Sequence, residues 1–109
     1  MGMAVIKRFE VWLIELDPTK GSEIQKTRPC LVVSPEPINK YLHTITVVPM
    51  TTTIRSYPKR VNCLFKGVAG QLMVDKIRGV DKSRLKKKLG IIEEKYSKAV
   101  CGVIIETYK

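Results

Sequence analysis

Apolar and β-branched side chains in the first part of the chain gather in short runs, which prolines, glycines and polar turn-forming residues separate. All six prolines lie within the first 58 residues, which disfavours long helices there. The pattern is typical of short strands joined by turns. We expect strands at Phe9–Leu16, Cys30–Val33, Thr44–Val48 (stopped by Pro49), Arg60–Phe65 and Gln71–Ile77. Alternation in the fourth run predicts that Val61, Cys63 and Phe65 share one face.

The pattern changes after position 79. The segment Asp81–Leu85 predicts a short helical turn with an acidic cap, and Leu89–Ile92 predicts one more strand. From Glu93 onward, apolar residues recur at spacings of four, three and one, the stripe of an amphipathic helix. The residues of this stripe are Tyr96, Val100, Val103 and Ile104.

The order of these elements predicts a mainly β (α+β) fold. No helix is long enough to cross between the early strands, so a small curled barrel suits them better than a βαβ arrangement. We expect the C-terminal helix to pack on this sheet. A length of 109 residues fits one domain. We place that domain at residues 8–109, after an N-terminal tail or first strand at residues 1–7.

Composition excludes several classes of protein. The hydrophobic fraction of 44% and the charged fraction of 28% are ordinary for a globular chain. No apolar run approaches the ~18 residues of a membrane span, and residues 1–7 are too short for a signal peptide, so we expect a soluble cytoplasmic protein. Cys30, Cys63 and Cys101 lie among apolar residues, as buried thiols in a reducing compartment do. With His43 as the one histidine, we expect no metal site and no cofactor.

Positive charge is concentrated in the second half of the chain. Residues 1–53 carry six basic and five acidic side chains, whereas residues 54–109 carry fourteen and five, and together they give the net charge of +10. Such a surface predicts a polyanionic partner, nucleic acid first, with salt-dependent binding. A solubilising surface is an equal alternative for Lys86–Lys88, and an acidic protein segment could use the same patch.

The chain lacks the motifs of most enzyme classes, including phosphate-binding glycine loops, nucleophile elbows and metalloprotease signatures. Two polar segments remain beside predicted strands: Lys20–Pro29, which leads into a buried strand, and Thr51–Thr53, which leaves another. Loops positioned by a rigid sheet are favoured places for function. We therefore look for chemistry in these two segments.

Several motifs resemble, in order and spacing, those of the MazF/PemK family of toxin endoribonucleases. They are Glu10-Val11-Trp12, Asp17-Pro18, Gly21-Ser22-Glu23, Arg28–Ser34, Val48–Thr52, Asp75–Arg78 and Asp81–Leu85. The resemblance runs from about residue 8 to the C-terminus. It departs from the family at Lys76, where members commonly have glutamine.

The resemblance implies an SH3-like barrel that forms a homodimer and cuts single-stranded RNA, such as mRNA, at a short sequence without a metal. It also implies an acidic, MazE-like antitoxin as a partner, and operator DNA binding only as part of the toxin–antitoxin complex. Arg28 and Thr51 match the family's catalytic pair, and Glu23 matches a residue implicated in activity in some members.

The residue types suit this chemistry, because RNA carries its own nucleophile in the 2′-hydroxyl. Attack on the adjacent phosphorus leaves a 2′,3′-cyclic phosphate and a 5′-hydroxyl. Arg28 can stabilise the charge on phosphorane oxygens with paired hydrogen bonds, and Thr51 can orient an oxygen. Glu23 is an available proton acceptor, with neutralisation of Lys20 or Lys26 as its equal alternative.

Further RNA contacts are expected from the polar loop, the threonine run and the basic segment. We assign them to Lys26, Thr52, Arg55, Tyr57, Lys59, Asp75, Lys76 and Arg78. Tyr57 is the aromatic residue best placed to stack on a base. Trp12 lies in an apolar run and suits the core or a dimer interface, and His43 lies outside the matching motifs and suits the surface.

Two rival functions stay open at this point. A toxin of the same fold could act on DNA gyrase without cutting RNA, and would inhibit supercoiling. A small barrel could also bind RNA without any chemistry, and would leave the RNA intact.

Overall fold

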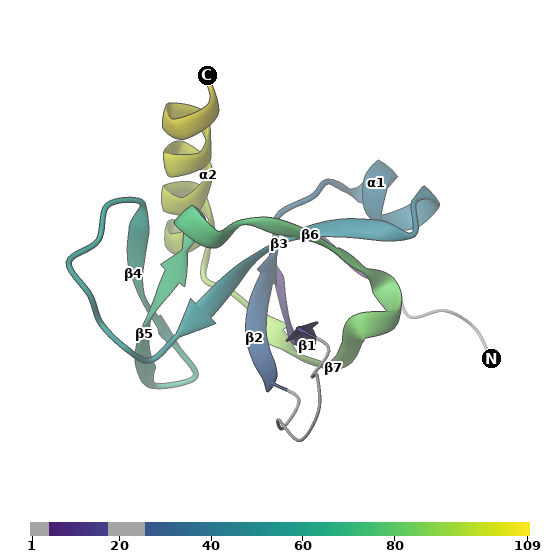
Figure 1. The fold of residues 1–109 in the computed structure, drawn as a ribbon, viewed down its shortest axis with the longest axis horizontal. Coiled ribbons are helices and arrows are strands. Elements are labelled where there is room, and N and C mark those ends of the chain that lie inside the picture. Colours follow the sequence, from purple (N-terminus) through teal and green to yellow (C-terminus); the bar gives the residue numbers. More distant parts are fainter. Residues whose placement is uncertain (1–4, 18–25) are drawn as a thin grey trace.

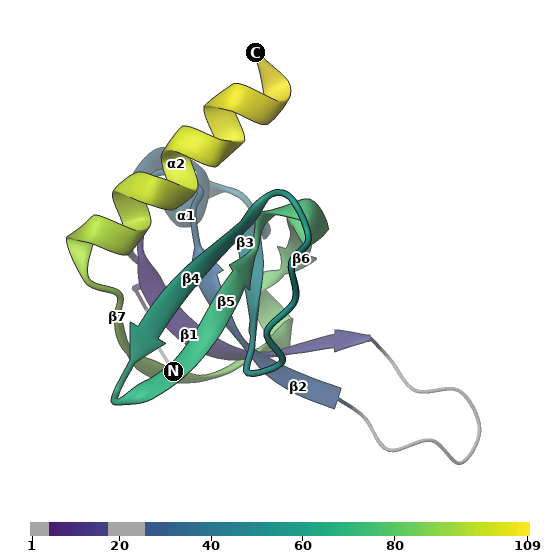
Figure 2. The ribbon, with the colours of Figure 1, turned by 90° about the vertical axis from the view of Figure 1, so that its left-hand side faces the viewer.

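The computed structural model describes residues 5–17 and 26–109, which form a curled antiparallel sheet with two helices (Figures 1 and 2). The strands are β1 (Glu10–Asp17), β2 (Lys26–Val32), β3 (Thr44–Thr51), β4 (Arg60–Phe65), β5 (Val68–Met73), β6 (Arg78–Asp81) and β7 (Leu85–Ile91). The helices are α1 (Glu36–Tyr41) and α2 (Glu94–Tyr108), with the short 3₁₀ turns η1 (Val74–Lys76) and η2 (Lys82–Arg84). The predicted mainly β fold with a C-terminal helix is confirmed.

Strand β3 is the centre of the sheet. The strands follow the order β4-β5-β3-β2-β1-β7, and β6 pairs with β3 outside this path. The first part of β3, Thr44–Val47, pairs with β6, whereas its last residues, Met50 and Thr51, pair with β5. This change of partner lets the sheet curl, and α2 stands over β4 on one side of the molecule (Figure 2).

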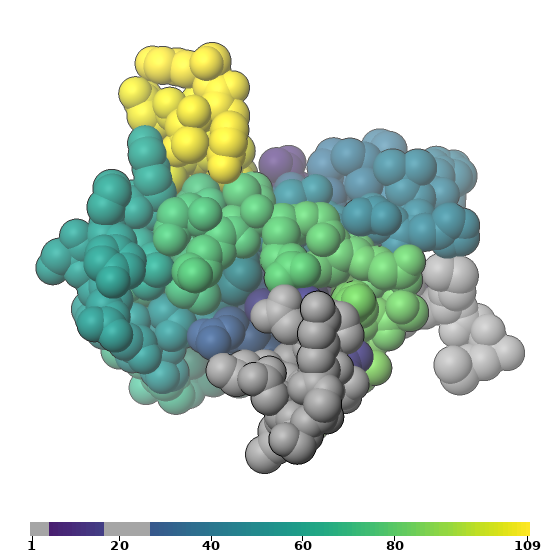
Figure 3. All heavy atoms as spheres, in the orientation of Figure 1, coloured from purple at the N-terminus to yellow at the C-terminus, as the bar shows by residue number. Residues whose placement is uncertain are grey.

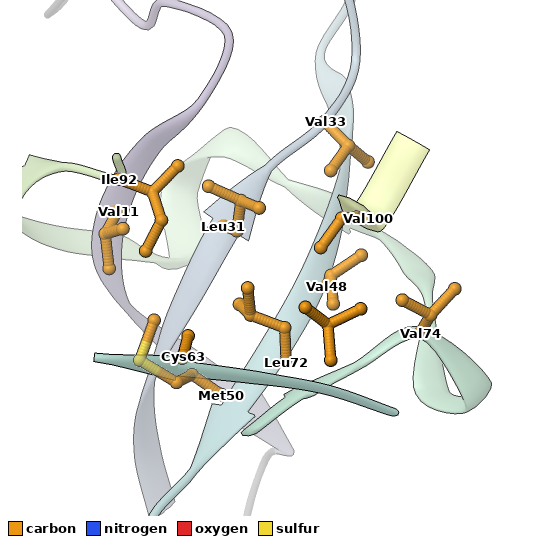
Figure 4. Close-up of a cluster of buried hydrophobic side chains, with 11 residues drawn as sticks. Val11, Leu31, Val33, Val48, Met50, Cys63, Leu72, Val74, Ile92 and Val100 are labelled. Atoms are coloured by element: carbon orange, nitrogen blue, oxygen red, sulfur yellow. The ribbon is translucent and has the colours of Figure 1, made fainter. Parts of the chain in front are cut away.

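The core lies in two clusters because the central strands are buried on both faces. In β2, Leu31 belongs to the cluster under α2, whereas Cys30 and Val32 belong to the other. Figure 4 shows Leu31, Leu72 and Val100 converging from β2, β5 and α2. Burial on both faces explains the continuous apolar run at Cys30–Val33. The predicted stripe of α2 is confirmed, since Val100 is buried in the first cluster and the other three residues pack against it.

Several predicted boundaries are wrong. The strand expected to stop at Pro49 continues to Thr51, because Pro49 lies where β3 leaves β6 and meets β5, a break that tolerates a missing N–H. The strand predicted at Cys30–Val33 is followed by the helix α1, which was not predicted; Pro37 lies in its first turn, where a missing N–H costs little. The expected strand Gln71–Ile77 is instead β5 followed by η1.

Two strands near the C-terminal end also differ from expectation. Strand β6 was not predicted, and β7 begins at Leu85 rather than at Leu89, because three consecutive lysines hide its alternation. The acidic cap is confirmed, since Asp81 Oδ1 accepts a hydrogen bond from the Ser83 N–H at 2.8 Å. The predicted faces of β4 are confirmed as well, with Val61 and Cys63 buried. Within the described residues, no helix has the length and apolar character that a bilayer crossing requires.

The β4–β5 hairpin and the segment before it form one side of the molecule, shown in teal beneath the yellow helix α2 in the space-filling view (Figure 3). The hairpin turns through Lys66 and Gly67, between the paired residues Phe65 and Val68. Both turn residues have positive φ, 52° and 80°, the conformation of a two-residue hairpin turn that matches the strand twist. Phe65, Lys66 and Val68, at and beside this tight turn, line a surface groove.

Candidate functional site

Strand pairing brings the predicted catalytic residues Arg28 and Thr51 together. Strands β2 and β3 pair antiparallel with Cys30 opposite Pro49. Arg28 and Thr51 each lie two residues beyond this pair, at the same end of the two paired strands. Both residues are partly exposed, and both line the same two grooves on the surface. Two segments more than twenty residues apart in the sequence therefore meet at one place.

The first of these grooves, here called the cationic groove, has a volume of about 480 Å³. Its lining residues are Leu16, Arg28, Pro49, Thr51, Thr53, Arg55, Tyr57, Arg60, Met73, Lys76 and Arg78. Five of these described residues are arginine or lysine, and none is aspartate or glutamate. A groove whose charged lining residues are all cationic concentrates an anionic ligand near its walls.

The second groove, here called the apolar groove, has a volume of about 550 Å³ and lies on the other side of the Arg28–Thr51 pair. Its lining residues are Thr27, Arg28, Pro29, Met50, Thr51, Thr52, Thr53, Phe65, Lys66, Val68, Ala69 and Gly70. The two grooves share Arg28, Thr51 and Thr53. A chain of nucleotides lying through both would cross the arginine–threonine pair between them.

The three consecutive threonines, Thr51–Thr53, differ in their contacts and in the grooves that they line. Thr51 Oγ1 accepts a hydrogen bond from the Thr53 N–H at 3.1 Å. This bond uses one lone pair of the hydroxyl and leaves its hydrogen to donate to a ligand. Thr52 is exposed, and it lines the apolar groove but not the cationic groove. Thr51 is thus the threonine whose position between the grooves fits the predicted catalytic role.

An ion pair holds one wall of the cationic groove. Arg60 Nε and Nη2 donate to the two carboxylate oxygens of Asp75 at 2.9 and 3.3 Å. The Arg60 guanidinium lies 4.8 Å from the centroid of the Tyr57 ring, within the range of a cation–π contact. Asp75, predicted to contact RNA, has its carboxylate engaged with Arg60. Asp75 is exposed but is not among the residues that line the groove.

The other predicted RNA contacts are distributed unevenly. Arg55, Tyr57, Lys76 and Arg78 line the cationic groove, whereas Lys59 is exposed and lines neither groove. Glu23 and the side chain of Lys26 lie outside the described residues. Their predicted roles therefore stay predictions.

Sequence reasoning missed Thr53, Arg60, Phe65 and Lys66 as groove residues. Arg60 and Lys66 were counted only as part of a basic segment. They occupy the first residue of β4 and the turn directly after it. Ends of strands that neighbour a candidate site are the signal that could have found them.

The lysines of β7 lie in a different electrostatic setting. Lys88 Nζ is 2.8 Å from Glu10 Oε2, and Lys86 Nζ is 3.7 Å from Glu15 Oε1. Glu10 is only 2% exposed and also accepts hydrogen bonds from the Lys7 N–H and the Trp12 indole, at 2.9 and 3.0 Å. Burial by itself raises the pKa of Glu10, but these hydrogen bonds and Lys88 outweigh it and hold the pKa below its ordinary value.

The tryptophan, the histidine and the cysteines, which were not assigned to the site, lie outside both grooves. Trp12, predicted to lie in the core or in a dimer interface, is buried in the second core cluster. His43 is exposed, and its carbonyl accepts a hydrogen bond from the Lys82 N–H. Burial raises the pKa of the Cys30 thiol to about 12, and it also raises that of Cys63. Cys101 is partly exposed, so only two of the three predicted buried thiols are buried.

Metal ligands are not clustered in the part of the chain that the structure describes. No group of three or more histidine, cysteine, aspartate or glutamate side chains there is arranged to hold an ion. The charged and hydroxyl-bearing side chains that line the two grooves are arginine, lysine, threonine and tyrosine.

Comparison with known proteins places this architecture in a defined group. Residues 7–108 match the family of PemK-like, MazF-like toxins of type II toxin–antitoxin systems. Endoribonuclease MazF9 of Mycobacterium tuberculosis is 35% identical over 98 residues, which cover 79% of this chain and 81% of that protein. Endoribonuclease MazF of Staphylococcus epidermidis is 32% identical over 96 residues, with 83% and 80% covered.

A further match, to Endoribonuclease PemK of Escherichia coli, is more local. It is 47% identical over 47 residues, which cover 43% of this chain and 35% of that protein. Among solved structures, MazF from Deinococcus radiodurans superimposes with a TM-score of 0.81 at 25% identity and covers 96% of this chain and 97% of its own. MazF in a MazE–MazF complex from the same organism superimposes with a TM-score of 0.83 at 26% identity, with 96% of each chain covered.

Proposed function

Because this chain belongs to the family of PemK-like, MazF-like toxins of type II toxin–antitoxin systems, we propose that it is an endoribonuclease that cuts single-stranded RNA such as mRNA at a short sequence. The observation that carries the proposal is that Arg28 and Thr51, from the neighbouring strands β2 and β3, both line the two grooves. The cationic groove would hold phosphates of the RNA, and the apolar groove would hold bases against Phe65 and Val68.

The proposed reaction uses residues of the chain, the RNA itself and one water molecule as proton donor. The 2′-hydroxyl oxygen attacks the adjacent phosphorus, the bond from phosphorus to the 5′-oxygen breaks, and a 2′,3′-cyclic phosphate and a 5′-hydroxyl form. The proton of the 2′-hydroxyl passes to a base, for which Glu23 is the candidate. The departing 5′-oxygen takes a proton from water in the open groove.

Arg28 acts mainly by electrostatic stabilisation in this scheme. Its guanidinium stays charged and can donate two parallel hydrogen bonds to the non-bridging phosphate oxygens, where negative charge grows in the transition state. The Thr51 hydroxyl, with its oxygen already accepting from the Thr53 N–H, donates to the substrate and aligns it. A hydroxyl is not basic enough to take the proton by itself, so the base is a separate group.

The proposed partners follow from the family and from charge. Relatives with solved structures include an endoribonuclease in complex with its cognate antitoxin, from a mycobacterial species. We infer that an acidic, MazE-like antitoxin lies along the cationic groove of this chain and blocks RNA entry. A homodimer, and operator DNA binding only within the toxin–antitoxin complex, belong to the same proposal.

The test is to incubate the purified protein with a mixed pool of single-stranded RNA in excess EDTA and to map the ends. We expect cuts at one short sequence, with 2′,3′-cyclic phosphate and 5′-hydroxyl ends. An Arg28→Ala protein purified in parallel controls for contaminating nuclease. Intact RNA together with inhibited DNA supercoiling would instead support the gyrase-directed alternative, and intact but bound RNA would support a binding protein without chemistry.

A further inference from the structure

Gln71 is a buried amide that none of the recognised motifs contains. It lies on β5 and is 3% exposed. Its main chain is paired on both sides, with Thr51 of β3 and with Asn62 of β4. Residue 71 is therefore where the strand that carries the catalytic threonine meets the outer hairpin.

The side chain of Gln71 binds the main chain of the segment at residues 52–59, which connects β3 to β4. Gln71 Oε1 accepts a hydrogen bond from the Arg55 N–H at 3.1 Å, and Gln71 Nε2 donates to the Arg55 carbonyl at 2.9 Å. Nε2 also donates to Asn62 Oδ1 at 2.9 Å. The amide thus satisfies both backbone polar groups of Arg55, as a neighbouring strand would.

The connecting segment depends on this contact because it forms no helix or strand of its own. At its start, the Thr53 N–H bonds Thr51, and at its end the Lys59 carbonyl accepts from the Val74 N–H. For the main chain of residues 54–58, the described part of the structure provides two hydrogen bonds, and both are made by the Gln71 side chain to Arg55. They fix the middle of the segment, from which Arg55 and Tyr57 reach the cationic groove.

The neighbouring glycine adds to this arrangement. A Cβ atom on Gly70 would lie 2.6 Å from the Thr51 carbonyl oxygen, closer than such contacts occur. The missing side chain lets β5 approach Thr51 closely, and the next residue then reaches across to Arg55. Gly70 therefore packs against the main chain of the proposed catalytic Thr51, and Gln71 binds the main chain of Arg55 in the wall of the cationic groove.

We propose that Gln71 is a positioning residue for RNA binding, which aims Arg55 and Tyr57 into the cationic groove by fixing the main chain of Arg55. The inference rests on the proposed function. Since these two residues would bind RNA away from the reacting atoms, loosening them weakens substrate binding and leaves the chemical step nearly intact. The signature is a change in KM without a matching change in kcat.

The test replaces Gln71 by methionine, which keeps the volume and removes the amide. We expect Gln71→Met to raise KM for a short RNA by about tenfold and to change kcat by less than about threefold. Hydrogen exchange of the Arg55 N–H, followed by NMR, should become faster. Asn62→Ala removes one partner of Gln71 and should change KM in the same direction by a smaller factor, which keeps the test usable if Gln71→Met folds poorly.

The matched control is Asn39→Leu, which removes another amide that is 3% exposed. Asn39 Nδ2 donates to the Ser34 carbonyl at 2.8 Å, and neither residue lines the grooves. This variant should leave KM and Arg55 exchange unchanged. Faster Arg55 exchange with unchanged KM, or equal changes in the Gln71 and Asn39 variants, would overturn the inference. A wild-type protein that cuts no RNA would instead overturn the proposed function, before any variant is compared.

Discussion

The lysines of β7 and the cations of the cationic groove carry the same charge in very different surroundings. Lys86 and Lys88 form ion pairs with Glu15 and Glu10, so part of their charge is neutralised within the protein. The described lining of the cationic groove holds five basic residues and no carboxylate. The density of lysine in the sequence therefore does not locate the polyanion site.

Strand neighbours explain this difference. In the pairing of β7 with β1, Lys88 lies opposite Trp12 and Lys87 opposite Leu13, which brings the lysines beside a strand that contains two glutamates. The groove cations come from β2, from the segment at residues 52–59, and from η1 and β6. Within the groove, Arg60 is held by Asp75. That pair supports Tyr57 and adds little net charge.

The largest effect that we predict in the groove, apart from loss of Arg28, follows removal of an uncharged group. Thr51→Val keeps the shape of the side chain and removes its hydroxyl, so the cleavage rate should fall by about 100-fold while RNA affinity changes little. Single-turnover kinetics and equilibrium binding measure the two quantities separately. A cleavage rate within a few-fold of wild type would mean that the groove acts through charge alone.

A lysine of β7 should affect stability instead. Lys88→Met leaves the buried Glu10 without its cation, so the free energy of unfolding should decrease by about 1–3 kcal/mol. RNA cleavage at a temperature well below the unfolding midpoint should be unaffected. Urea unfolding and a cleavage assay test this together. If Lys88→Met weakened RNA binding without lowering stability, Lys88 would bind RNA as the groove cations do, and the distinction between the two sets of cations would be wrong.

The salt dependence of RNA binding separates the two sets of cations more finely. On an Arg28→Ala background that prevents cutting, Arg55→Gln should reduce the slope of log affinity against log salt by about 0.7, the value for one phosphate contact on a single strand. Lys86→Gln serves as the matched control and should leave the slope unchanged. Equal slopes for the two variants would show that both surfaces contact phosphate.

The smallest effect that we predict is a loss of stability that occurs only in acid. The pKa of Glu10 is lower in the folded protein than its ordinary value of 4.5, so Glu10 contributes stability above pH 4.5. This contribution is lost as the pH falls through the folded value. Urea unfolding from about pH 6 to about pH 3 should show a loss of stability in the wild type that is smaller in Glu10→Gln.

The sequence predicts the parts of the fold that depend on local pattern. The stripe from Tyr96 to Ile104 and the alternation in β4 needed no knowledge of neighbours. The path of β3 through Pro49 and the strand β7 were mispredicted, because each depends on which strand lies alongside. Such information is not present in a local window.

The candidate site likewise contains residues that sequence motifs predicted and residues that only the structure reveals. Arg28 and Thr51 were predicted from motifs, and the neighbouring strands β2 and β3 bring them to the same grooves. Arg60, Lys66 and Gln71 became visible only in three dimensions, since their roles depend on residues that lie fifteen or more positions away or on a turn at the edge of a groove. An ordinary glutamine inside a strand gives no sequence signal of a buried contact to a neighbouring loop.

The central claim is that cutting resides in the Arg28–Thr51 pair and not in positive charge as such. The most direct measurement is the single-turnover cleavage rate at saturating protein for Arg28→Ala beside Lys86→Ala, each of which removes one positive charge. We predict a fall of about 100- to 1,000-fold for Arg28→Ala, with an unchanged unfolding curve, and a rate within about twofold of wild type for Lys86→Ala. Equal rates in the two variants would contradict the account.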